Sequence, residues 1–103
     1  MTNSSVCLTL VVNRAIREEV FEYLYERSDL VSGFTASEVE GHGPTVRLHS
    51  ASEQVKGRAD RVLIRVILDE LAAKTLIGLI KQAFAGSHLI YWITPVLSAG
   101  VIE

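Results

Sequence analysis

The sequence has little of what marks secreted, disulfide-bonded or membrane-spanning proteins. It contains one cysteine, two prolines and one tryptophan among 103 residues. The lone Cys7 cannot form a disulfide within the chain, so we expect a reducing, cytoplasmic compartment. Residues 1–5 carry no cationic side chain, and the apolar run 6–12 is too short for a signal peptide. No stretch approaches the ~20 apolar residues that span a bilayer, so no direct membrane insertion is expected.

Recognised catalytic motifs are also absent. The sequence has no Gly-x-Ser-x-Gly turn, no Walker-type phosphate loop, no Gly-x-Gly-x-x-Gly after a strand and no His-Glu-x-x-His. No pairing of a nucleophile with a base is apparent. We therefore expect a protein that is not an enzyme.

Charge of neither sign dominates, but the two signs are unevenly placed. The formal net charge is −2. The segment 41–65 holds five cations against Glu53 and Asp60, giving +3, so the remainder carries −5. Nucleic-acid binders usually present a basic domain, so we expect no nucleic acid partner and consider a local anion site. The alternative is pairing of the cations (Arg47, Lys56, Arg58, Arg61 and Arg65) with the acidic predicted helix that carries Glu18, Glu19, Glu22 and Glu26.

Apolar periodicity predicts alternating strands and helices. The run 6–12 is apolar on both faces, as in a strand covered on both sides. Helices are predicted over 14–27, after an Asn13 cap, and from an Asp69 cap to about Phe84, with Gly86 as its C-terminal cap. Further strands are predicted over 33–40, 61–68 and 89–94, the last stopped by Pro95. The apolar tail 96–103, which contains Gly100, is a candidate for a further short edge strand.

This order, β-α-β-loop-β-α-β, is that of the split βαβ or ferredoxin-like arrangement. We predict a single α+β domain over 1–103, with a four-stranded antiparallel sheet and two helices on one face. The other face offers Leu63 and Ile67, together with either Tyr91 and Ile93 or Ile90 and Trp92. An apolar face of this extent exceeds what soluble monomers usually expose. We therefore expect a homo-oligomer that buries it.

A polar stretch of twenty residues, 41–60, interrupts the pattern. Compact domains rarely carry a loop of this length without secondary structure, and those that do use it for binding or leave it disordered. Lys56, Arg58 and Arg61 cluster near its end, where Gly57 allows close backbone approach. Guanidinium groups bind phosphates and carboxylates. A small anionic ligand, such as a nucleotide, is one hypothesis, and a solvated loop base is the other.

The same stretch carries His42 and His49, seven residues apart. Imidazole binds zinc, copper and nickel, but no tightly spaced ligand pair accompanies these histidines. Solvated loop histidines are the competing interpretation. Cys7 is expected to be a small apolar residue of its strand. The adjacent Tyr91 and Trp92 point to opposite faces of theirs, one into the core and one to the open face or a subunit boundary.

These features resemble the PII signalling superfamily, in the exit Glu38–Gly43 into a long loop and the re-entry through Gly57-Arg58. More closely, the chain resembles a small PII-like family of uncharacterised bacterial proteins, often associated with heavy-metal efflux systems. The resemblance covers nearly the whole chain and is carried by the stretches 30–35 (LVSGFT), 52–58 (SEQVKGR) and 91–96 (YWITPV).

The resemblance implies a homotrimer with open sheet faces turned inward, and it identifies 41–60 as the T-loop through which PII proteins contact their targets. PII ligands lie in clefts between subunits at the loop base, near Gly41, His42, Gly43, Lys56, Gly57, Arg58 and Arg61. The implied function is signal transduction, with a small ligand in these clefts and a partner protein, such as an efflux component, on the loop. Metal binding by His42 and His49 is the alternative.

The chain departs from PII at three places. The phosphate-binding turn before the last strand aligns with Ala85-Gly86-Ser87-His88 and lacks its lysine, while the C-terminal arginines and the loop tyrosine have no counterpart. Classical ATP and 2-oxoglutarate sensing is therefore not expected. Relatives of the CutA type share the trimer, but function does not follow from fold alone.

Overall fold

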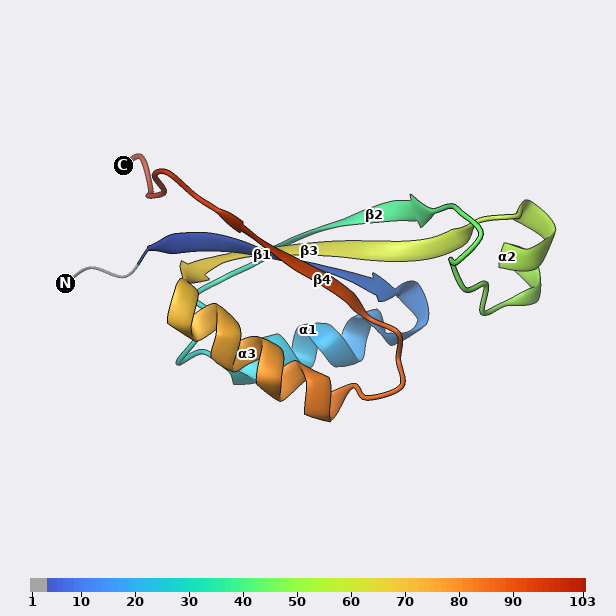
Figure 1. Cartoon of the computed structure of the whole chain (residues 1–103), viewed down its shortest axis with the longest axis horizontal. Helices are drawn as coiled ribbons and strands as arrows, with labels where there is room; N and C mark the ends of the chain where they lie inside the picture. Colours follow the sequence, from blue (N-terminus) through green and yellow to red (C-terminus); the bar gives the residue numbers. More distant parts are fainter. Residues whose placement is uncertain (1–3) are drawn as a thin grey trace.

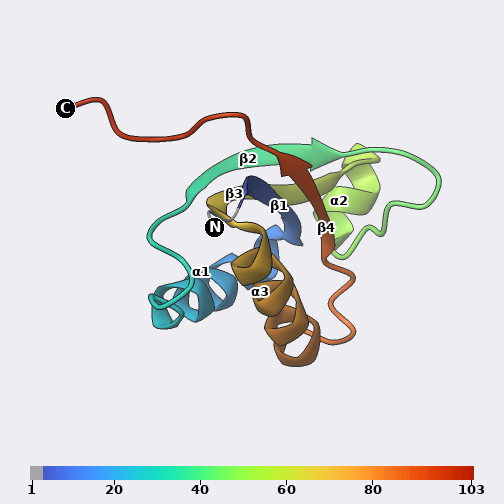
Figure 2. The same cartoon turned by 60° about the vertical axis from the view of Figure 1, so that its left-hand side comes forward.

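One antiparallel sheet organises the protein, which we describe from a computed structural model over residues 4–103 (Figure 1). The strands are β1 (Ser5–Asn13), β2 (Thr35–Gly41), β3 (Ala59–Asp69) and β4 (Ile90–Pro95), in the order β2-β3-β1-β4. The helices are a 3-10 turn (Arg14–Ile16), α1 (Arg17–Glu26), α2 (Ala51–Lys56) and α3 (Glu70–Ala83). Helices α1 and α3 cover one face of the sheet, and α2 projects beyond one end (Figures 1 and 2). The predicted α+β, ferredoxin-like arrangement is confirmed.

The core lies between the sheet and α1 with α3. Successive side chains of a strand point to opposite faces, and the two central strands bury one alternation completely. Register pairs Leu10 of β1 with Ile64 of β3 at the middle of this face. Complete burial of such a side chain contributes ~1.5–3 kcal/mol. The fully buried large side chains are Leu8, Leu10, Val12, Val20, Leu24, Val62, Ile64, Val66 and Leu76.

The helix starts follow the predicted caps. The Asn13 side chain accepts a hydrogen bond from the Ala15 amide at 3.1 Å, although the first three residues form a 3-10 turn before α1 begins at Arg17. Asp69 ends β3 and its carboxylate accepts the Ala72 amide at 2.8 Å, which starts α3. Gly86 adopts φ +83 in the turn after α3, but the C-cap itself is Phe84, two residues before the predicted position.

Two predictions at the C-terminal end need correction. Pro95 is the last residue of β4 rather than the residue that follows it, because its missing amide falls at the end of the ladder. The tail 96–103 forms no strand. Val96 donates the final backbone bond, to Ser5 O at 3.1 Å, and the chain then leaves the body of the molecule (Figure 2). Leu97, Val101 and Ile102 are consequently exposed.

The face opposite the helices is uncovered, as predicted, and it exposes the apolar side chains of Ile67, Ile90 and Trp92 (Figure 1). Register places Trp92 beside Thr9 and Ile90 beside Val11. These residues share the open face, so Tyr91 lies on the helix side. Trp92 is 44% exposed and Ile90 is 49% exposed. Within residues 4–103, no helix combines the length and apolar character of a membrane span.

Candidate functional site

The segment between β2 and β3 is folded, which corrects the prediction of a structureless stretch over 41–60. Strand β2 extends to Gly41 and β3 begins at Ala59, so the connection is 42–58, and α2 occupies six of its residues. The Ser50 hydroxyl caps α2 by accepting the Glu53 amide at 3.1 Å. Gly57, at φ +74, closes the helix and donates to Glu53 O at 2.8 Å. These are standard N-cap and left-handed C-cap arrangements.

The Glu53 side chain holds the two ends of α2 together. Its Oε1 accepts the His49 amide at 2.6 Å, and its Oε2 accepts the Asp60 amide at 2.7 Å. The residue is only 3% exposed. These backbone hydrogen bonds lower the pKa of Glu53, against the opposing effect of burial. One carboxylate therefore fastens the loop helix to the start of β3.

Sequence reasoning missed Glu53, although a signal was present. The spacing Ser50-x-x-Glu53 matches the capping-box pattern of helix starts. In that pattern the glutamate bonds the amide of the cap residue itself. Here it reaches one residue further, to His49, and its second oxygen is left for Asp60.

Arg61 and Gly41 anchor the loop from the sheet side. Arg61 is 5% exposed, and its Nη2 donates to the Arg47 carbonyl at 3.0 Å. A Cβ on Gly41 would lie 3.2 Å from Val46 Cγ1 and 3.3 Å from Ala59 Cβ. Glycine at this position thus admits the Val46 side chain against the strand. Both predicted site residues hold the loop in place.

The ionisable residues among the other predicted site residues are His42, Lys56 and Arg58. They fall into two groups of contacts with acidic side chains. Glu40 lies between His42 and Arg58, with Oε1 3.1 Å from His42 Nε2 and Oε2 3.3 Å from Arg58 Nε. Arg58 Nε is enclosed but has no well-directed hydrogen bond. Lys56 Nζ instead lies 3.2 Å from Asp60 Oδ2. The structure thus gathers His42 and Arg58 around one carboxylate and places Lys56 in a separate pair.

The alternative pairing with α1 is not observed. Within residues 4–103, no ion pair links a cation of the 41–65 segment to a glutamate of α1. Arg17 of α1 and the preceding Arg14 both contact Glu38 of β2, at 3.5 and 3.6 Å. Two of the loop cations, Lys56 and Arg58, instead have acidic partners on the hairpin itself, Asp60 and Glu40.

The two loop histidines have different surroundings. The His42 ring contacts Glu40, whereas His49 contributes its backbone amide to Glu53. In the part of the chain that the structure describes, no group of three or more His, Cys, Asp or Glu side chains could hold a metal ion. Cys7 lies half-buried on the open face, 3.8 Å from the Thr9 hydroxyl.

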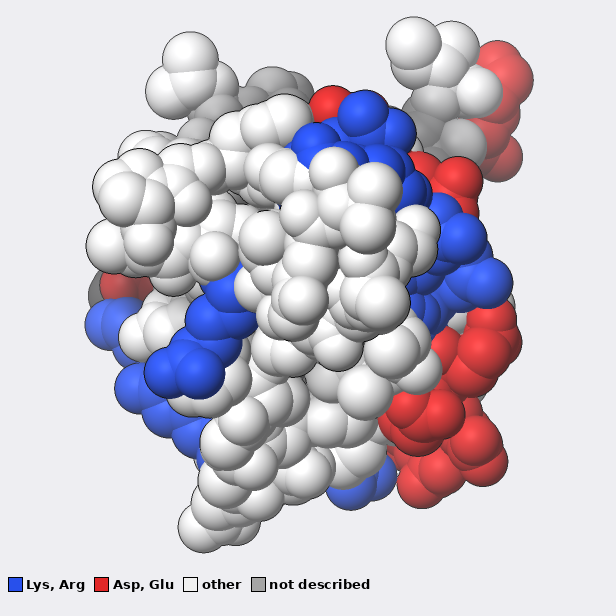
Figure 3. Space-filling view, turned by 90° about the vertical axis from the view of Figure 1, so that its right-hand side faces the viewer, with Lys and Arg blue, Asp and Glu red and all other residues white. Residues whose placement is uncertain are grey.

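The loop end presents a mixed surface. Uncharged side chains cover its middle, basic side chains lie on both flanks, and acidic side chains gather on one side (Figure 3). Val55 on α2 is 88% exposed. An exposed apolar side chain on a surface with charged edges is an arrangement that partner proteins recognise.

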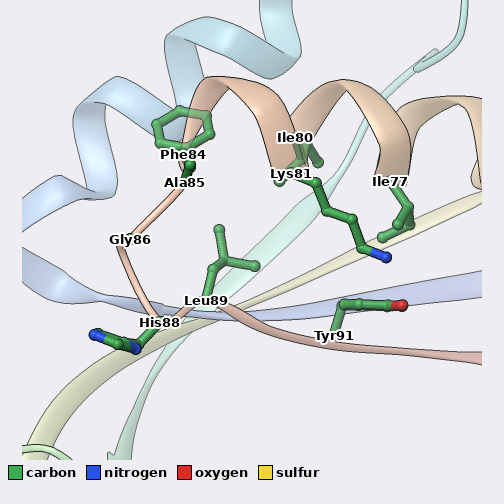
Figure 4. Close-up of a pocket in the computed structure, with 9 residues that line it drawn as sticks. All are labelled: Ile77, Ile80, Lys81, Phe84, Ala85, Gly86, His88, Leu89 and Tyr91. Atoms are coloured by element: carbon green, nitrogen blue, oxygen red, sulfur yellow. The ribbon is translucent and has the colours of Figure 1, made fainter.

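A hollow of 380 Å³ lies between α3 and β4, away from the loop (Figure 4). Its apolar lining comes from Ile77, Ile80, Phe84 and Leu89, and no acidic residue lines it. The Lys81 ammonium lies 5.4 Å from the centre of the Tyr91 ring at the mouth. His88, on the turn, has the positive φ of +58 that non-glycine residues seldom adopt.

This hollow is of a size that holds small ligands. Its lining suits an apolar body with a negative group directed to Lys81. Sequence reasoning missed it because the α3 residues concerned have the spacing of ordinary core positions. Only the turn 85–88 stands out in the sequence.

Comparison with known proteins gives the following matches. A family model described as Protein of unknown function (DUF3240) matches residues 2–103. Among curated proteins, no significant sequence match was found.

Among solved structures, a DUF3240 family protein from Shewanella baltica has a TM-score of 0.78 at 14% identity, covering 99% of this chain and 100% of that one. CPII, a nitrogen regulatory PII-like protein from Thiomonas intermedia K12 bound to ADP, AMP and bicarbonate, has a TM-score of 0.69 at 16% identity, covering 95% and 96%. GlnK from B. subtilis, in complex with ATP, has a TM-score of 0.66 at 16% identity, covering 93% and 84%. The shared feature is the PII-like fold.

Proposed function

Since the chain belongs to the DUF3240 family and has a PII-like fold, we propose that it is a cytoplasmic regulatory protein without enzymatic activity. It binds a small anionic ligand at the base of the 41–60 loop and presents the loop to a partner protein. The working form is a homotrimer whose open sheet faces turn inward.

The observation that carries this proposal is the Glu40 cluster at the loop base. Glu40 of β2 engages both His42 and Arg58, the first and last residues of the connection between β2 and β3. An incoming phosphate or carboxylate competes with Glu40 for Arg58, whose enclosed Nε lacks a well-directed hydrogen bond. When the ligand replaces Glu40 as the partner of Arg58, the contact between the two ends of the loop changes. A ligand then biases the loop between two arrangements.

The partner surface is the outer side of the loop. Val55 is 88% exposed there, and charged side chains flank the uncharged centre of this end (Figure 3). The family resemblance in the sequence favours a component of a heavy-metal efflux system as the partner. The oligomer rests on the apolar open face, where Ile67, Ile90 and Trp92 are each more than two-fifths exposed.

Adenine nucleotides are the first ligands to test, because CPII and GlnK were solved with them. Calorimetric titration with ADP, AMP and ATP should detect binding that Arg58→Gln weakens at least about tenfold, as expected for loss of a charged hydrogen bond. Lys74→Gln is the matched control, because Lys74 forms a surface pair with Glu70 on α3. Equal affinities in the two variants would contradict a role for Arg58.

Deletion of residues 45–56 tests the partner surface. It should abolish capture of the efflux component and lower metal resistance in cells while leaving the oligomer intact. Unchanged resistance and capture would overturn the proposal. Titration with zinc, copper, nickel and cobalt tests the alternative metal function of His42 and His49, which requires binding tighter than millimolar that is lost on replacing both residues with alanine.

A further inference from the structure

The open face of the sheet carries a cation, Arg65, without an acidic partner. Register sets Arg65 of β3 between Thr9 of β1 and Thr35 of β2, with Trp92 beyond Thr9. Arg65 and these three neighbours all carry hydrogen-bond donors. None of the ion pairs within residues 4–103 includes Arg65. A row of donors therefore crosses the middle of a face that also carries the apolar side chains of Leu63, Ile67 and Ile90.

The strands supply no carboxylate to this row. The acids Glu38, Glu40 and Asp60 occupy the alternation that points to the helix side, since each pairs in register with a neighbour of that set. Asp69 shares the alternation of Arg65, but it lies at the end of β3 and its carboxylate caps α3. The only acid after β4 is Glu103, on the exposed tail. The positive charge of Arg65 is thus uncompensated on the sheet.

A small hollow of 110 Å³ opens beside this guanidinium. It is lined by Thr35, Ala36, Ser37, Leu63 and Arg65. Its polar side chains are two hydroxyls and the guanidinium, and no acid lines it. One water occupies about 30 Å³ in the liquid, so the hollow suits a group of a few atoms. A guanidinium fork matches the paired oxygens of an oxyanion, and hydroxyls can donate to the same group.

We propose that Arg65, Thr35 and Ser37 form a binding site for a small oxyanion, and that the site closes when open faces pack together. The inference rests on the open-face oligomer of the proposed function, but the site is separate from the loop base. Ile67 and Trp92 on the same face favour burial. An unpaired guanidinium opposes it, because a buried charge needs a counter-charge. Anion binding and assembly therefore strengthen each other.

Sedimentation velocity of the full chain tests the linkage, in sodium sulfate, phosphate, acetate and bicarbonate against chloride at equal ionic strength. Saturating oxyanion should lower the subunit dissociation constant by at least about a hundredfold, the scale set by an uncompensated buried charge. Arg65→Gln should lose this response. Arg65→Leu should assemble without oxyanion, because an apolar side chain needs no counter-charge.

Three variants make the outcome specific. Lys74→Gln removes a surface cation that pairs with Glu70 on the helix side and should respond as wild type. Glu103→Gln should also respond as wild type, and loss of its response would assign the counter-charge to the tail instead. Sulfate stabilises proteins generally by exclusion from their surface. An equal sulfate effect in wild type and Arg65→Gln would therefore mean general salt action and overturn the site.

The oxyanion site and the proposed function can be tested independently of each other. An NMR titration of the Arg65 side-chain Nε–Hε signal with sulfate reports binding whether or not the protein assembles. A shift that saturates supports the site even for a monomer, in which case only the oligomer is lost from the proposed function. No shift and no anion-dependent assembly overturn the site, while nucleotide titration of Arg65→Gln still tests the loop base.

Discussion

The Glu53 carboxylate accepts the Asp60 backbone amide at 2.7 Å, seven residues along the chain. Its other oxygen accepts the His49 amide. The contact spans α2 and joins it to the first residues of β3. This attachment inside the loop adds to the one that Arg61 makes at the Arg47 carbonyl. The order of the 42–58 connection depends on this side chain.

Glu53→Ala should release α2. Each buried amide that loses its acceptor costs about 1–3 kcal/mol unless water replaces it. Hydrogen exchange at the His49 and Asp60 amides should accelerate by at least about tenfold, while the Leu10 and Ile64 amides in the central strands change little. Glu70→Ala, which removes a surface pair with Lys74, should leave the loop amides unchanged. Unaltered exchange at Asp60 in Glu53→Ala would contradict the proposed attachment.

Loop order should also depend on pH. The pKa of Glu53 is lower in the folded protein than in the unfolded chain, where a glutamate titrates near ~4.3. Its contribution is therefore fully present above the unfolded pKa and is lost as the pH falls through the lower folded pKa. Carbon-13 titration of Glu53 with amide exchange at pH 3 to 6 measures both quantities. Glu53→Gln should remove the pH dependence of loop exchange in this range, and its persistence would assign that dependence to another group.

Two glycines should respond in opposite directions to alanine. Gly57 adopts φ +74 at the end of α2, so Gly57→Ala should destabilise the loop helix by ~1 kcal/mol. Gly78 lies within α3, where an added Cβ would have no neighbouring side chain or strand within 4 Å. Gly78→Ala should therefore stabilise the protein by ~0.5–1 kcal/mol. Thermal unfolding distinguishes the signs for the global fold, and hydrogen exchange distinguishes them for the loop.

Trp92→Ser should disrupt an oligomer built on the open face. Trp92 is 44% exposed in the single chain and lies on the face that lacks helices. Tyr25→Ser is the control, because Tyr25 is 72% exposed on α1, on the other side of the sheet. Sedimentation should show Trp92→Ser as a folded monomer and Tyr25→Ser at the wild-type size. If both variants keep the wild-type size, the subunits meet elsewhere.

Much of the sheet was predictable because the buried apolar positions of its central strands recur every two residues. Val62, Ile64 and Val66 follow the period of two, and all three are buried against the helices. The same period could not decide between Tyr91 and Trp92, since both are amphipathic aromatics on an edge strand. The pairing of Thr9 with Trp92 places Trp92 on the open face and Tyr91 on the helix side. This pairing depends on the register of the whole sheet.

The loop was harder to predict because its order comes from few, specific contacts. Helix α2 has six residues, which is too short to show an apolar period and too short to be stable alone. Its signal in the sequence is confined to the cap Ser50, Glu53 at the third position after it, and Gly57. The Arg58 contact to Glu40 could not be read from spacing, because it joins the last residue of the connection to β2 across the loop. The Arg61 bond to the Arg47 carbonyl likewise spans fourteen residues.

Strand β3 runs without interruption from Ala59, beside the loop, to Asp69, which caps α3. Eleven extended residues span ~36 Å, and β3 is held on both sides by β1 and β2. No flexible linker separates its end from the first turn of α3. A displacement of Ala59 would therefore be transmitted along β3 to the N-terminus of α3. A change at the loop base is in this way coupled to the opposite end of the sheet.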